Sequence, residues 1–115
     1  MKKVLTLACM ILLSACGDNT PQCNSDDTIG LVAEIAQTKD PLISQWLSNK
    51  AISGVKVADI RTQEVNKAHH TSTCAASLNL IDSDTNQTSL TYPIIYTAQS
   101  TDDGKNIYVN INGLP

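Results

Sequence analysis

The sequence predicts a small α+β domain in which an N-terminal amphipathic helix packs on a four-stranded antiparallel sheet. Two observations predict this class. Apolar residues between positions 29 and 47 recur at the three- and four-residue spacing of one helix face. From position 55 onward they alternate with polar residues, in runs separated by short turn-forming segments. Such runs are typical of half-buried strands that follow one another in sequence.

The helical region spans residues 27–50 and contains one interruption. Polar and acidic residues at positions 25–27 can cap its start, where negative charge is favourable. The pattern breaks at Asp40-Pro41, because proline is tolerated in the first turn of a helix but not in its interior. Asp40 can then act as the N-cap of a second helical segment. We therefore expect two consecutive helices or one kinked helix. The apolar residues of the two parts are Ile29, Val32, Ile35 and Ala36, then Leu42, Ile43, Trp46 and Leu47.

Four strands are predicted after the helical region. The alternation of the first shifts phase near Ala58-Asp59, which indicates a β-bulge. Pro93 in the third favours an edge or a bulge, because proline donates no ladder hydrogen bond. Asp103-Gly104 marks the last connection as a hairpin loop. The predicted strands span residues 55–60, 71–80, 90–96 and 107–111.

Short connections between sequential strands predict an antiparallel meander. One apolar face of that sheet needs a cover, and the amphipathic helical region is the only candidate. This order of elements resembles the cystatin-like layout, in which a sheet curls around one helix. The third or fourth strand is expected to form an open sheet edge, and Tyr108 should point away from the core.

The first sixteen residues have the organisation of an export signal. A basic start, Met1-Lys2-Lys3, precedes an apolar run over residues 4–13. That run is too short to span a bilayer as a helix but matches the core of a secretory signal. Leu13-Ser14-Ala15-Cys16 follows. This tetrapeptide resembles the lipobox of bacterial lipoproteins and fits it at all four positions. An ordinary cleaved signal with an incidental cysteine is the alternative.

The lipobox resemblance implies a cleaved signal peptide over residues 1–15 and lipidation of Cys16 by a diacylglycerol, followed by acylation of the new N-terminus. It places the protein in the cell envelope, with the lipid bilayer as one partner. Gly17 follows the cysteine, whereas in this family an aspartate there favours the inner membrane. We therefore expect the outer membrane, facing the periplasm. Residues 16–25 are predicted to be a polar tether, and residues 26–115 a single α+β domain.

Cleavage and lipidation leave Cys23 and Cys74, because Cys9 is removed with the signal. In the oxidising periplasm two remaining cysteines most simply form a disulfide. The bridge would join the start of the helical region to the second strand. Two free thiols or a metal site are the alternatives, but two cysteines without suitably spaced histidines make a poor zinc site.

No motif predicts a catalytic residue or a cofactor. His69 and His70 are adjacent, so on a strand their side chains would point to opposite faces. We expect both to be exposed near a turn, with a metal or pH-sensing role as the alternative. No nucleophile elbow and no glycine-rich phosphate loop is present.

Asp82, Asp84 and Asn86 have the spacing that opens a calcium-binding loop. Gln87 stands where that loop requires glycine, and Pro93 stands where it requires glutamate. We therefore expect a polar hairpin turn and no metal site.

The charge of the mature chain restricts its function. Removal of Lys2 and Lys3 with the signal leaves six basic and eleven acidic residues, a net charge of −5. An acidic chain without a basic patch argues against nucleic acid as a partner.

The chain is loosely similar to small enterobacterial lipoproteins of prophages and mobile elements.

These observations favour a non-enzymatic binding module that engages an envelope protein, as an exclusion factor or an inhibitor. The alternatives are a structural subunit of a secretion or conjugation apparatus, and a small-ligand carrier or enzyme.

Overall fold

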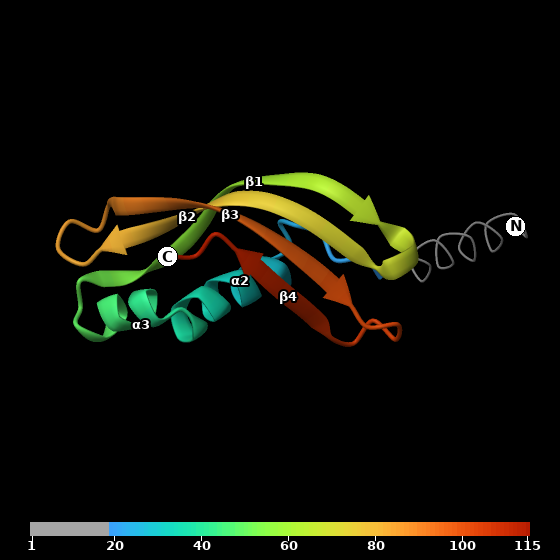
Figure 1. The fold of residues 1–115 in the computed structure, drawn as a ribbon, viewed down its shortest axis with the longest axis horizontal. Helices are drawn as coiled ribbons and strands as arrows, with labels where there is room; N and C mark the ends of the chain where they lie inside the picture. Colours follow the sequence, from blue (N-terminus) through green and yellow to red (C-terminus); the bar gives the residue numbers. More distant parts are fainter. Residues whose placement is uncertain (1–18) are drawn as a thin grey trace, which may run out of the picture.

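The computed structural model describes residues 19–115, which form two helices packed on a four-stranded sheet (Figure 1). Neighbouring strands are antiparallel, in the order β1-β2-β3-β4. The predicted α+β class and the meander are therefore confirmed. The elements are α2 (Asp26–Lys39), α3 (Pro41–Ser48), β1 (Ile52–Asn66), the short 3-10 helix η1 (Lys67–His69), β2 (Thr71–Asp82), β3 (Thr88–Ser100) and β4 (Ile107–Asn112).

Two side-chain caps set the helix boundaries. The Ser25 hydroxyl accepts a hydrogen bond from the backbone N–H of Thr28 at the start of α2. Asp40 ends α2 and begins α3, because its carboxylate accepts from the N–H of Ile43 at 3.0 Å. With Pro41 in its first turn, α3 is a second helix, so the structure has the two consecutive helices and not the single kinked helix that the sequence also allows.

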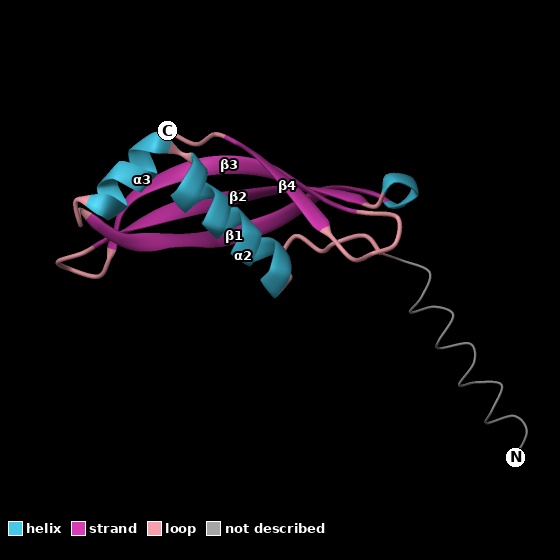
Figure 2. Cartoon of the chain, turned by 90° about the horizontal axis from the view of Figure 1, so that it is seen from below, coloured by secondary structure: helices cyan, strands magenta, loops and turns pink. Residues whose placement is uncertain are grey.

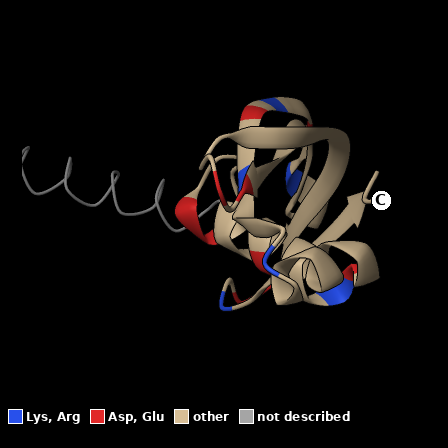
Figure 3. Ribbon diagram, turned by 90° about the vertical axis from the view of Figure 1, so that its left-hand side faces the viewer, with Lys and Arg blue, Asp and Glu red and all other residues tan. Residues whose placement is uncertain are grey.

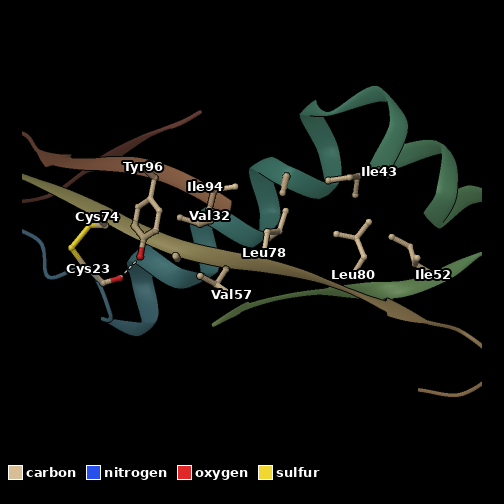
Figure 4. Close-up of a cluster of buried hydrophobic side chains, with 12 residues drawn as sticks. Cys23, Val32, Ile43, Ile52, Val57, Cys74, Leu78, Leu80, Ile94 and Tyr96 are labelled. Atoms are coloured by element: carbon tan, nitrogen blue, oxygen red, sulfur yellow. Dashed lines mark hydrogen bonds between the residues drawn. A yellow bond between two sulfur atoms is a disulfide. The ribbon is translucent and has the colours of Figure 1, made fainter. Parts of the chain in front are cut away.

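Both helices cover the same face of the sheet (Figure 2). The core lies between them and the inner faces of the strands, where the alternating residues of β2 point toward the helices. Tyr96 is its largest fully buried side chain. The other buried apolar residues include Val32, Ala36, Ile43, Ile52, Val57, Ala76, Leu78, Leu80 and Ile94 (Figure 4).

β1 is longer than the alternation predicts. The bulge is confirmed by a register shift between Ala58 and Arg61 and by a left-handed backbone at Asp59, where φ is 53°. Beyond the bulge, residues 61–66 stay paired with β2 but are exposed. No apolar alternation marks this part, because the helices do not cover it.

β3 is only partly flanked by β4. The register pairs β4 with Ile95–Ser100, so the first half of β3, Thr88–Ile94, has no partner on that side. Pro93 lies in this open stretch, which confirms the predicted edge position. The chain leaves the sheet at Gly113, where φ is 104° and a Cβ atom would lie 2.5 Å from the carbonyl oxygen of Pro93. Only glycine fits there.

The domain is elongated, with principal extents of 63 × 27 × 22 Å. One end, here called the arm end, consists of η1 and the β3–β4 loop, residues 101–106, where the described chain begins (Figure 1). The opposite end, the far end, consists of α3 and the β2–β3 turn, residues 83–87. Within residues 19–115, neither helix has the length and apolarity needed to cross a bilayer.

Candidate functional site: the N-terminal arm

Residues 19–23, here called the arm, run along the sheet before α2 begins, and the sheet binds their backbone. In an extended chain every second carbonyl points the same way. Three such carbonyls, at alternate positions of the arm, each accept a hydrogen bond from a buried hydroxyl of β2 or β3. The pairs are Ser100 to Asn19 at 2.6 Å, Ser72 to Pro21 at 2.6 Å, and Tyr96 to Cys23 at 2.8 Å.

A disulfide between Cys23 and Cys74 closes the arm onto β2 (Figure 4). The two Cα atoms are 5.8 Å apart, and both residues are buried. This confirms the predicted pairing of the start of the helical region with the second strand. The bridge spans 51 residues, for which the chain-entropy model gives a stabilisation of about 4 kcal/mol.

Tyr96 connects the arm to the core. Its ring is fully buried among the core side chains, while its hydroxyl donates to the carbonyl of Cys23. Burial raises the pKa of this phenol above its usual value. The neutral hydroxyl therefore remains the donor throughout the physiological pH range.

The first described residue, Asn19, also contacts the β3–β4 loop. Its side-chain amide donates to the carbonyl of Asp102 at 3.4 Å. Gly104 adopts φ +74°, and a Cβ atom there would lie 3.0 Å from Oδ1 of Asn19. Asp103 stabilises the loop, because its carboxylate accepts a hydrogen bond from the hydroxyl of Thr101. This hydrogen bond lowers the pKa of the Asp103 carboxyl.

The sequence predicts a polar tether over residues 16–25, but the part that the structure describes, residues 19–25, is bound to the domain. The sequence does not reveal this because the hydroxyls of Ser72 and Ser100 sit in strands whose other polar positions face solvent. No local pattern shows which carbonyl a buried serine will meet.

Two small hollows adjoin the arm end. One, of about 210 Å³, lies between the arm and the residues Thr62 and Val65 of β1. The other, of about 350 Å³, lies between Leu31 of α2 and the start of β4, with Asp27 and Lys105 at its rim. In the described part of the chain, no three metal-ligating side chains converge on one point.

The predicted turn residues serve local structure. Asp82 accepts hydrogen bonds from the backbone N–H groups of Asp84 and Thr85, each at 2.9 Å, and these hydrogen bonds lower the pKa of its carboxyl. The polar hairpin turn is therefore confirmed. His69 is exposed at the end of η1, as predicted. His70 is only partly exposed, contrary to the prediction, because its left-handed backbone starts β2 and its Nδ1 atom is buried.

Charge is distributed unevenly over the sheet. β3 and β4 carry no charged residue, whereas β1 carries Lys56, Asp59, Arg61 and Glu64. Figure 3 marks Lys and Arg in blue and Asp and Glu in red on the ribbon, with all other residues in tan. Tyr108 of β4 is 65% exposed, as the alternation predicts. The β1 edge is thus protected by charge and by its bulge, while the opposite edge is uncharged.

Residues 1–18, with the predicted signal peptide and Cys16, lie outside the described residues. Comparison of the chain with protein-family models, with curated proteins and with solved structures found no match. The lipobox and the cystatin-like layout therefore stay predictions from sequence and from the order of elements.

Proposed function

We propose that the mature chain, residues 16–115, is a lipid-anchored binding module that faces the periplasm and engages another envelope protein. The observation that carries this proposal is the tetrapeptide Leu13-Ser14-Ala15-Cys16, which ends three positions before the arm begins at Asn19. The disulfide between Cys23 and Cys74 supports the location, because such bridges persist in oxidising compartments.

The anchor follows from the chemistry that the lipobox implies. Burial of each methylene group contributes about 0.8 kcal/mol, and one acyl chain alone gives only reversible binding. A diacylglycerol on the Cys16 thiol and a third chain on its amino group together make a stable anchor. We propose the outer membrane as its location, because Gly17 follows the cysteine.

The uncharged sheet edge supports a role in binding a protein. Thr88–Tyr92 of β3 and the outer side of β4 have no neighbouring strand, so a partner's strand can pair with their backbone groups. No lysine or other charge opposes such pairing along these two strands. Such a module could block the entry of a phage or plasmid at an outer-membrane receptor. It could also inhibit an envelope enzyme.

The proposal is tested by fractionation and crosslinking of intact cells that express the wild-type chain or Cys16→Ala. We expect the wild type in the membrane fraction, crosslinked to one envelope protein, and the variant released in soluble form. Equal membrane association of the two chains would refute the anchor. Repeated absence of a crosslinked protein, with the anchor intact, would refute the binding role.

A further inference from the structure

The two ends of the elongated domain are not equivalent with respect to the proposed anchor. The arm begins at Asn19, whose backbone and side chain are held by Ser100 and by the β3–β4 loop. Asn19 therefore belongs to the arm end, and α3 with the β2–β3 turn lies at the other end of the long axis (Figure 1).

The linker between the anchor and the bound arm is short. Only Gly17 and Asp18 separate Cys16 from Asn19. Three Cα-to-Cα steps of an extended chain reach at most about 11 Å. The arm does not lengthen this linker, because three of its carbonyls are hydrogen-bonded to the sheet and Cys23 is bonded to Cys74.

We propose that the arm end rests against the headgroup layer of the bilayer, so that the domain stands on this end and presents its far end to the envelope partner. The inference rests on acylation of Cys16, which is part of the proposed function. The partner surface is a phospholipid headgroup layer that carries anionic lipid.

The distribution of charge favours the same orientation. At the arm end, Lys67 and Lys105 balance Asp102 and Asp103. The other described residues comprise four basic and eight acidic side chains, a net charge of −4. An anionic lipid surface repels this acidic body more strongly than it repels the balanced end. Charge therefore opposes an arrangement in which the domain lies flat.

The far end then extends away from the membrane along a body 63 Å long. Leu42 on α3 of this end is 43% exposed, and Leu90, three residues beyond the β2–β3 turn on β3, is 47% exposed. Leu90 also lies on the stretch of β3 that has no β4 partner. A protein that binds there would contact the domain well above the lipid headgroups.

Energy transfer from single labelled positions to a dye on the lipid headgroups tests this orientation. Three exposed positions serve as label sites in the lipidated full chain: His69→Cys at the arm end, Glu34→Cys on α2, and Ser83→Cys at the far end. The vesicles contain phosphatidylethanolamine and phosphatidylglycerol. We expect transfer from position 69 to be several times that from position 83, with position 34 between them.

Equal transfer from positions 69 and 83 would show a domain that lies flat and would overturn the inference. The strongest transfer from position 34 or 83 would overturn it as well. The failures of the two proposals are distinguishable by flotation. If the wild-type chain fails to float with the vesicles, the anchor itself is refuted. If it floats with equal transfer from both ends, only the orientation is refuted.

A linker variant tests the cause of the orientation. Insertion of about ten Gly/Ser residues between Asp18 and Asn19 adds an r.m.s. span of about 18 Å. The anchor and the fold stay intact, so this chain should still float. We expect the difference in transfer between positions 69 and 83 to shrink. An unchanged difference would contradict the view that the short linker and the clamped arm set the orientation.

Discussion

Replacement of Tyr96 by phenylalanine removes the hydroxyl that joins the core to the arm and leaves the ring in place. The hydroxyl donates to the carbonyl of Cys23 at 2.8 Å, and both residues are buried, so no solvent can substitute for the lost donor. A buried acceptor left without a partner costs about 1–3 kcal/mol. For a domain of this size, 1 kcal/mol corresponds to roughly 4–8 °C in Tm. We therefore expect Tyr96→Phe to lower Tm by about 10 °C.

Thermal unfolding followed by circular dichroism, with the disulfide intact, measures this effect. Tyr108→Phe is the matched control, because it removes the same atom from a side chain that is 65% exposed. Surface changes of this kind stay within about 0.5 kcal/mol. Equal Tm values for Tyr96→Phe and the wild type would refute the view that the Tyr96 hydroxyl holds the arm.

Three further predictions concern stability. The double variant Cys23→Ser with Cys74→Ser should have a free energy of unfolding about 4 kcal/mol lower in denaturant titration, since the loop of 51 residues is no longer closed. A decrease of less than 1 kcal/mol would contradict this. Asp40→Ala should lower the free energy of unfolding by about 1 kcal/mol, because the N–H of Ile43 loses its acceptor. Asp40→Asn keeps an acceptor oxygen and should retain most of the stability. Asp82 and Asp103 have lowered pKa values in the folded state, chiefly through hydrogen bonds from the Thr85 N–H and the Thr101 hydroxyl. Their contribution is present above the ordinary carboxyl pKa and is lost as the pH falls below about 4. Asp82→Asn with Asp103→Asn should therefore show a shallower loss of stability in acid, and an unchanged slope would contradict the assignment.

The parts of the fold that the sequence predicts are those with a local chemical cause. Asp40 followed by Pro41 marks the boundary between the helices, because one side chain caps and the other can only begin a helix. Cys74 lies on the buried face of an alternating strand. Its pairing with Cys23 is predicted because removal of Cys9 and lipidation of Cys16 leave these two cysteines for a disulfide.

The parts that the sequence does not predict depend on the tertiary environment. Residues 61–66 extend β1 through backbone pairing with β2, although their side chains are exposed and show no alternation. The arm is bound because the hydroxyls of Ser72 and Ser100 meet its carbonyls across about fifty and eighty residues of sequence. Neither arrangement leaves a periodic signal, because each depends on a partner distant in the chain.

Mass spectrometry of the N-terminus of the protein from native membranes shows directly whether Cys16 anchors the domain. We expect a chain that begins at Cys16 and carries a diacylglycerol on its thiol and an acyl group on its amine. A chain that still begins at Met1, or one cut elsewhere with a free Cys16 thiol, would contradict it.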